Sequence, residues 1–329
     1  MDHSDVSTDL TTRPLRRGRS GVEPDDVALV TRLVLSCDVA VLGEPDSGAA
    51  EVTAMLGAPA MDLAASFLAY DGDEPVGWCS VESDRTGHQT FVHPFAPPGP
   101  RAREVRDLGL RRGIAAARTT RDAVAGPGRP WTVRAGCWLA DEDYAATILA
   151  HGFVPVRRFF RMRIASSSPL VPAVAPTLPD GVELVVCDND ATRRRVWAVD
   201  EESFADHFNH TPREFDEWWA YVSDAATLDP AGWWLLTVDG DDAAICLLDD
   251  SRAELGDGYV AALGVRRPYR GRGLAQLLLR RAFVHNRDRG RAGTQLSVDS
   301  ENATGAVAVY ERVGMAVTRA FQGHAMVLD

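Results

Sequence analysis

Short hydrophobic runs alternate with amphipathic stretches along the chain, and together they predict a protein built of strands and helices. The run at 260–265 has the length and composition of a buried strand. From Leu274 the spacing becomes helical, with apolar residues at 274, 277, 278, 282 and 283 and arginines between them. A polar loop at 266–273 joins the two. The pattern therefore predicts a strand, a glycine-rich basic turn and an amphipathic helix in direct succession.

The same order of elements is predicted twice. Asp-Gly segments at 71–74 and 239–242 each lie between apolar runs and predict β-hairpins. Each hairpin is followed by a predicted strand, a long helix, a second strand and a short helix. The short helices end in similar sequences, His-Gly-Phe at 151–153 and Val-Gly-Met at 313–315. This order predicts an internal duplication.

The segment at 165–179, ASSSPLVPAVAPTLP, marks the predicted domain boundary. It is rich in serine and proline and predicts an extended linker. We therefore expect an N-terminal domain at 25–164 and a C-terminal domain at 180–329, and two domains suit a chain of 329 residues. Residues 1–24 are polar and predict a disordered tail, with contact between its arginines and an acidic partner as the alternative.

Composition narrows the classes of protein that remain. A net charge of −12 disfavours a general nucleic-acid binder. The five cysteines are far apart and lack CxxC spacing, so we expect free thiols in a reducing compartment and neither a disulfide framework nor a metal site. No apolar run approaches the roughly 20 residues that span a bilayer. We therefore expect a cytoplasmic protein with no membrane or nucleic-acid partner.

The turn at 266–273 carries the candidate chemistry. Its glycines let an anion approach the backbone, and a helix start leaves N–H groups whose dipole favours negative charge. Arg270 and Arg272 add charge that pairs with phosphate. The turn is not a P-loop, since no Lys-Ser or Lys-Thr pair follows, and it lacks the third glycine of a dinucleotide motif. From these residues alone, a site for a phosphorylated ligand and a solvated turn remain open.

Two motifs at the expected separation resemble the signatures of GCN5-related N-acetyltransferases, the GNAT superfamily. Residues 270–275, Arg-Gly-Arg-Gly-Leu-Ala, resemble the family motif Arg/Gln-x-x-Gly-x-Gly/Ala. The stretch from Asn302 to Met315 resembles the second motif, Asn…Leu-Tyr-x-x-x-Gly-Phe. The N-terminal domain resembles a second copy that lacks the signature at 97–101. This layout is similar to that of tandem-domain GNAT proteins, mycothiol synthase-like proteins among them.

The resemblance implies an α/β (α+β) protein of two tandem GNAT-like domains, with catalysis in the C-terminal one. Each domain is expected to hold a mixed, mostly antiparallel central sheet flanked by helices, with strands 4 and 5 splayed apart. The implied co-substrate is acetyl-CoA, the acceptor is a primary amine of a small molecule, and the protein is a monomer or a homodimer. The residues implied to bind the cofactor are Leu263, Gly264, Val265, Arg270, Gly271, Arg272, Gly273, Leu274, Ala275, Asn302 and Tyr310.

Acyl transfer to an amine needs a base, an oxyanion donor and an acid. Family position implies the backbone N–H of Val265 as the oxyanion donor and Tyr310 as the acid for the CoA sulfur, because tyrosine keeps its proton at neutral pH. The usual strand carboxylate is missing, since Tyr259 occupies that region. We take Asp257 as the first candidate for the base. The other candidates are Glu254, Asp299, Glu301, His207 and His210.

Two alternatives remain open at this stage. A non-catalytic acyl-CoA sensor or scaffold would bind the cofactor without transfer; the missing carboxylate favours it, whereas Tyr310 favours an enzyme. Four tryptophans are expected either to wall an acceptor pocket or to belong to the core. These are Trp218, Trp219, Trp233 and Trp234.

Overall fold

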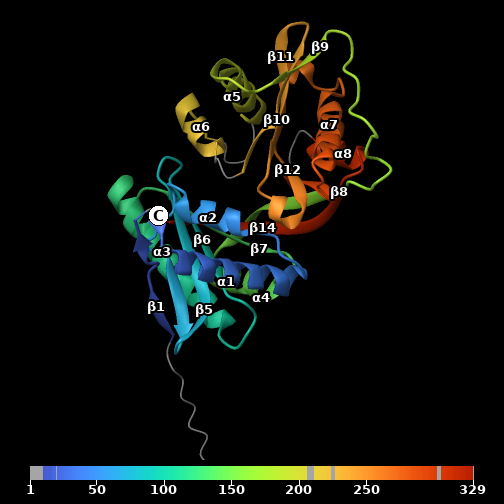
Figure 1. Cartoon of the computed structure of the whole chain (residues 1–329). Coiled ribbons are helices and arrows are strands. Elements are labelled where there is room, and N and C mark those ends of the chain that lie inside the picture. Colours follow the sequence, from blue (N-terminus) through green and yellow to red (C-terminus); the bar gives the residue numbers. More distant parts are fainter. Residues whose placement is uncertain (1–9, 20, 206–210, 224–226, 302–304, 329) are drawn as a thin grey trace, which may run out of the picture. The chain divides into compact units, whose positions relative to one another are not determined.

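The expected duplication takes the form of two units with the same strand topology (Figure 1). The computed structural model describes residues 10–19, 21–205, 211–223, 227–301 and 305–328. Unit 1 comprises Met1–Arg157 with Phe321–Asp329, and unit 2 comprises Arg158–Ala320. No helix among the described residues is long and apolar enough to cross a membrane.

Unit 1 contains a six-stranded sheet in the order β1–β4–β5–β6–β7–β14. All neighbours pair antiparallel except β6 and β7, which are parallel. A short ribbon of β2 and β3 lies apart from this sheet. The strands are β1 (Thr11–Arg13), β2 (Arg17–Gly18), β3 (Gly21–Val22), β4 (Phe67–Asp71), β5 (Glu74–Asp84), β6 (Gln89–Phe95), β7 (Trp131–Trp138) and β14 (Ala316–Leu328). The helices are α1 (Pro24–Leu42), α2 (Ala49–Gly57), α3 (Ala102–Val124) and α4 (Glu142–Ala150).

Unit 2 repeats this plan in the order β9–β10–β11–β12–β13–β8, with β12 and β13 as its parallel pair. Its strands are β8 (Val154–Ala165), β9 (Val182–Val186), β10 (Leu228–Val238), β11 (Asp241–Asp249), β12 (Asp257–Val265) and β13 (Gly293–Asp299). Its helices are α5 (Asp190–Phe204), α6 (Phe215–Val222), α7 (Leu274–Asp288) and α8 (Ala306–Arg312), with 3-10 turns η1 (Ala253–Leu255) and η2 (Arg267–Tyr269). The predicted mixed, mostly antiparallel sheets flanked by helices are confirmed.

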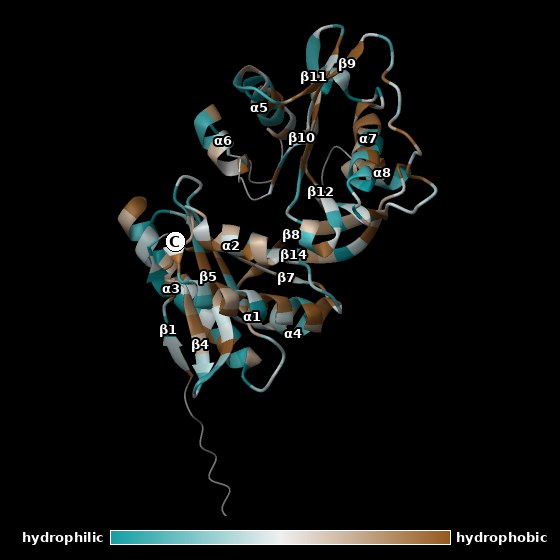
Figure 2. Cartoon of the chain, viewed as in Figure 1, coloured by the Kyte–Doolittle hydropathy of each residue, from teal (hydrophilic) through white to brown (hydrophobic). Residues whose placement is uncertain are grey.

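The unit 2 sheet has an apolar core on each face. One core joins the sheet to α7 and α8, and the other joins it to α5 and α6. Trp218, Trp233 and Trp234 are buried in these cores, so the core alternative holds for them. Figure 2 shows hydrophobic residues along β10 and a hydrophilic tip on the β10–β11 hairpin, at 239–242.

Two strands are exchanged between the halves of the sequence. β8, which ends the N-terminal half, belongs to the sheet of unit 2, and β14, which ends the C-terminal half, belongs to the sheet of unit 1. We expected 158–164 to close the N-terminal domain, but Phe159–Ala165 of β8 pairs with β13 of unit 2. Reciprocally, Phe321–Leu328 of β14 pairs with β7 of unit 1. The predicted boundary was wrong here because alternation along a strand specifies which residues are buried, not which neighbouring strand is chosen.

The serine- and proline-rich segment at 165–179 lies within unit 2 and is not a linker between the units. Val171 belongs to the core beneath α7. Arg281 donates to the carbonyl of Pro176 at 2.6 Å, and Arg287 donates to that of Pro172 at 2.6 Å. These guanidinium groups satisfy carbonyls of a proline-rich backbone that forms no strand ladder.

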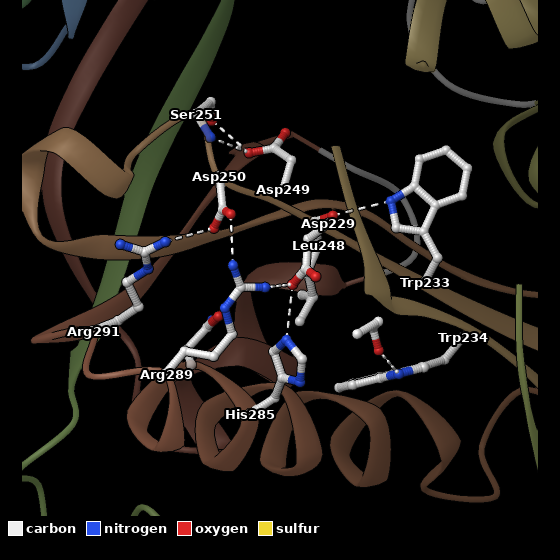
Figure 3. A network of polar contacts seen from close by, with 12 residues as sticks. Asp229, Trp233, Trp234, Leu248, Asp249, Asp250, Ser251, His285, Arg289 and Arg291 are labelled. Atoms are coloured by element: carbon white, nitrogen blue, oxygen red, sulfur yellow. Dashed lines mark hydrogen bonds and ion pairs between the residues drawn. The ribbon is translucent and has the colours of Figure 1, made fainter. Parts of the chain in front are cut away.

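A buried polar network fixes the far end of α7 to the sheet (Figure 3). Asp229, at a bulge in β10, accepts a hydrogen bond from His285 at 2.8 Å and pairs with Arg289. Arg289 also pairs with Asp250 at 2.6 Å, and His285 lies edge-on to Trp234. Burial raises the pKa of Asp229, but the hydrogen bonds and electrostatic interactions with His285 and Arg289 outweigh burial, so the pKa is lowered. The network therefore holds an ionised carboxylate and anchors the helix whose other end faces the candidate site.

The N-terminal segment is ordered from Leu10, so the prediction of a disordered tail was wrong for residues 10–19 and 21–24; residues 1–9 and 20 lie outside the described part of the chain. β1 pairs with β4. Arg13 and Arg16 each bond the buried carboxylate of Asp26 at 2.7 Å. Two of the tail's arginines thus have an acidic partner within the chain itself.

We predict that Asp26→Asn loosens this segment. Hydrogen bonds from Arg13 lower the pKa of Asp26 although burial opposes them. The carboxylate therefore stabilises the fold fully above its ordinary pKa of 3.8, and the contribution is lost as the pH falls through its lower folded value. At neutral pH we expect a loss of about 1–3 kcal/mol in the free energy of unfolding, measured with denaturant. Asp25→Asn is the control because the Asp25 side chain is 89% exposed; equal effects of the two variants would contradict the prediction.

Candidate active site

The two parallel strands of unit 2 separate after a short paired stretch. β12 and β13 pair only from Asp257–Tyr259 against Gly293–Gln295, although both strands continue well beyond. A β-bulge at Ala261 interrupts the ladder between β11 and β12. The splay predicted for strands 4 and 5 is confirmed, and it opens onto a cavity of about 780 Å³ in unit 2.

The backbone of β12 presents groups to this gap that pair with no neighbouring strand. The N–H of Arg266 donates to the carbonyl of Ala243 at 2.9 Å. Because hydrogen-bonded and non-hydrogen-bonded pairs alternate along an antiparallel ladder, Val265 and Leu263 turn their N–H and C=O groups away from β11. The opposite edge of β12 borders the splay, so these groups face the gap.

The turn after β12 forms an uncapped helix start. Gly271 and Gly273 have φ angles of +77° and +79°, which residues with a side chain rarely adopt. Gly273 is the N-cap of α7 and has no side chain to cap it, whereas Asn189 caps α5 by accepting from the Thr192 N–H. Among the described residues, no hydrogen bond uses the N–H groups of 271–276; the first donor is Leu277, to Gly273 at 3.0 Å. This row of amides, with the helix dipole behind it, suits an anion.

The two arginines of the turn have different surroundings. Arg270 donates to the carbonyl of Val265 at 3.0 Å and to that of Ser203 at 3.4 Å. It therefore ties the turn to β12 and α5. Arg272 is exposed, lies 5.2 Å from the ring centre of Tyr269, and has no carboxylate partner within the described ranges. Its charge is available to a ligand.

Tyr310 lines the cavity from α8. Its side chain is buried, and no described residue forms a hydrogen bond with its hydroxyl. Burial raises the pKa of Tyr310 to about 12, with smaller contributions from Cys246 and Tyr259. The hydroxyl therefore keeps its proton throughout the physiological range.

The cavity brings together most of the residues singled out in the sequence, and Arg272 flanks it. Asn302 lies outside the described residues. Those that line the cavity are Leu263, Gly264, Val265, Arg270, Gly271, Gly273, Leu274, Ala275 and Tyr310. The sequence analysis missed Ser203 and Phe204 on α5, Phe159 on β8 and Ser297 on β13. No local motif marks these four, because they reach the cavity only through the tertiary fold.

Asp257, our first candidate for the base, does not line the cavity. It lies at the start of β12, where its carboxylate accepts from Arg163 at 2.6 and 2.9 Å and from Gln295 at 2.6 Å. This ion pair gives Asp257 a structural role at the first paired step of β12 and β13, two residues before the strands separate. The sequence could not reveal it, because Arg163 comes from the exchanged strand β8.

The other candidate bases differ in whether they line the cavity. Asp299 lines the cavity, and its Oδ1 accepts from the backbone N–H of Glu301 at 2.9 Å. Glu254 and Glu301 are not among the residues that line it. His207 and His210 lie outside the described residues.

Unit 1 has the same splay but not the same turn. β6 and β7 pair only from Gln89–Phe91 against Thr132–Arg134. The following turn contains Pro97, Pro98 and Pro100, which have no N–H to donate. Arg101, at its end, pairs with Asp71 and Glu104. Unit 1 therefore lacks the amide cradle of unit 2. No cluster of three metal-binding side chains occurs in the described part of either unit.

Comparison with known proteins agrees with this geometry. Residues 192–315 match the model of the Acetyltransferase (GNAT) family. A mycothiol acetyltransferase of Streptomyces avermitilis is 35% identical over 263 residues, which cover 76% of each chain. A GCN5-related N-acetyltransferase from Sphaerobacter thermophilus superposes with a TM-score of 0.79 at 27% identity, covering 97% of this chain and 95% of that one. A tandem GNAT protein from the clavulanic acid biosynthesis pathway shares the fold, with a TM-score of 0.68 at 16% identity and coverage of 97% and 98%.

The fold and the site thus define a tandem acetyltransferase. The chain belongs to the GNAT family and is an N-acetyltransferase of that family.

We predict that Asp257→Asn lowers stability but spares catalysis. The change weakens a buried ion pair, so we expect a loss of about 1–3 kcal/mol in the free energy of unfolding. At a temperature where the variant is folded, kcat should stay within about twofold of wild type, since Asp257 is not at the cavity. A hundredfold fall in kcat with unchanged stability would instead make Asp257 the base.

Proposed function

We propose that this enzyme transfers the acetyl group of acetyl-CoA to a primary amine of a small molecule, in the cavity of unit 2. The observation that carries the proposal is the edge of β12 at Leu263 and Val265, which pairs with no strand across the gap and leads directly to the uncapped amides at 271–276. An extended ligand with amide groups in its arm and a pyrophosphate at its end matches both parts.

In this proposal the pyrophosphate binds the N–H groups at 271–276, with Arg272 adding charge. The pantetheine arm pairs with the gap-facing groups of Leu263 and Val265, as an added strand pairs with a free sheet edge. The cavity of about 780 Å³ is of the size that holds a cofactor.

The chemistry follows from the groups around the splay. The N–H of Val265 polarises the thioester carbonyl and stabilises the tetrahedral oxyanion. The amine forms the new C–N bond, the C–S bond breaks, and Tyr310 donates its proton to the departing thiolate. Of the candidate bases in the described part of the chain, Asp299 alone lines the cavity, so we assign the amine proton to Asp299, directly or through water.

A small molecule is the acceptor class that the relatives support. The relative from Streptomyces avermitilis is named a mycothiol acetyltransferase, and this name contains no protein or nucleic-acid target. The net charge of −12 also suits a cationic amine acceptor.

A sensor that binds acetyl-CoA without transfer is the second candidate, because Tyr259 stands where the family carboxylate is expected. We predict that Tyr310→Phe separates the two. In calorimetry the variant should bind acetyl-CoA as tightly as wild type does. A library screen of amines first identifies an acceptor. With that acceptor, the kcat of the variant, measured by release of the CoA thiol, should fall about 100-fold. A pKa of about 12 also means that kcat should not fall up to about pH 10 through loss of this proton.

Tyr144→Phe is the matched control for this prediction. Tyr144 is a buried tyrosine on α4 of unit 1 whose hydroxyl likewise has no partner in the described structure. Its loss should leave kcat unchanged. Undiminished turnover in Tyr310→Phe would remove Tyr310 as the acid, and wild-type protein that binds no acetyl-CoA would reject the proposal.

A further inference from the structure

Ser203 brings an unused hydroxyl to the wall of the cavity. It lies one residue before the end of α5 and lines the cavity, and it is only 6% exposed. Its Oγ is buried and has no hydrogen-bond partner among the residues that the structure describes. A buried hydroxyl without a partner is unfavourable, so a ligand that supplies one gains affinity.

Ser203 is packed directly against the splayed strand. A Cβ at Gly264 would lie 2.8 Å from the Cβ of Ser203 and 3.0 Å from its Oγ. Glycine at 264 is therefore what allows α5 to approach β12 this closely. The contact places the hydroxyl beside Gly264, the residue before Val265.

Arg270 holds this arrangement together. Its guanidinium donates to the carbonyl of Val265 at 3.0 Å and to that of Ser203 at 3.4 Å. One side chain thus fixes the end of α5 to the residue whose N–H faces the gap. Ser203 of α5 and Val265 of β12 are thus held by one side chain, and both residues line the cavity.

We propose that the Oγ–H of Ser203 donates a second hydrogen bond to the carbonyl oxygen of the acyl thioester, alongside the N–H of Val265. This inference rests on the proposed function. The proposal requires χ1 of Ser203 to adopt a staggered position in which the hydroxyl points into the cavity. Ser203 keeps its proton throughout and forms no covalent bond; it stabilises the negative charge that develops on the acyl oxygen.

Unit 1 also contains a buried serine hydroxyl, that of Ser80, which serves as a comparison for Ser203. Ser80 in unit 1 is also fully buried, and its hydroxyl has no partner within the described ranges, but Ser80 does not line the cavity of unit 2. A buried serine alone is thus not the basis of the inference. The close packing on Gly264 and the shared guanidinium are what distinguish Ser203.

A pair of CoA derivatives tests the proposal without knowledge of the acceptor. Acetyl-CoA carries the carbonyl oxygen, whereas S-ethyl-CoA has the same arm and a similar size but lacks it. Calorimetry on the full-length wild type, Ser203→Ala and Ser80→Ala gives the ratio of the two dissociation constants for each protein. We expect wild type and Ser80→Ala to favour acetyl-CoA equally, and Ser203→Ala to lose about three- to tenfold of that preference.

Turnover and stability give independent readouts. Loss of an oxyanion donor should lower kcat of Ser203→Ala by about 100-fold with little change in KM for acetyl-CoA. Because Ser203→Ala removes no side-chain hydrogen bond seen in the described part of the chain, the Tm of this variant should equal or exceed that of wild type. A purely packing role would leave both kcat and the ligand preference unchanged.

The outcomes separate this inference from the proposed function. If wild type binds acetyl-CoA and Ser203→Ala retains the full preference, the inference alone is overturned. If Ser203→Ala loses affinity equally for both derivatives, Ser203 contacts a part that they share, and the inference is again overturned. If wild type binds neither derivative, the proposed function itself fails.

Discussion

The separation of β12 from β13 after Tyr259 is the feature on which the rest of the site depends. Backbone N–H and C=O groups require partners, and a central strand normally finds them on both sides. Here the bulge at Ala261 turns β12 away, so the groups at Leu263 and Val265 keep their capacity to bond. The surrounding structure holds this opening in place, with the ion pair of Asp257 and Arg163 at its closed end and Arg270 at its open end.

The two units show that this opening is necessary but not sufficient for an anion site. Both have a parallel strand pair that separates after three residues. Only the turn of unit 2 follows it with glycines in the left-handed region and unused amides; that of unit 1 has prolines, which cannot donate. The contrast assigns the candidate chemistry to one unit on physical grounds, by the presence or absence of N–H groups.

Local features of the fold and of the site were predictable from the sequence. The strand–turn–helix around Arg270, the two Asp-Gly hairpins and the duplicated order depend on periodicity and turn chemistry, which act over short distances. The exchange of β8 and β14 and the packing of the proline-rich segment were not predictable, because they depend on which distant partner an apolar strand or a carbonyl meets. For the same reason Asp257 was taken as a base, and Ser203 was missed until α5 was seen against Gly264.

The central claim is that one cofactor binds along β12 and at the start of α7. Amide hydrogen exchange of the full-length protein, with and without acetyl-CoA, tests it most directly. Slowed exchange should concentrate at Leu263, Val265 and 271–276, whose amides have no partner among the residues that the structure describes. The corresponding segment of unit 1, residues 91–102, should be unaffected. Protection at 91–102 with none at 271–276 would contradict the account.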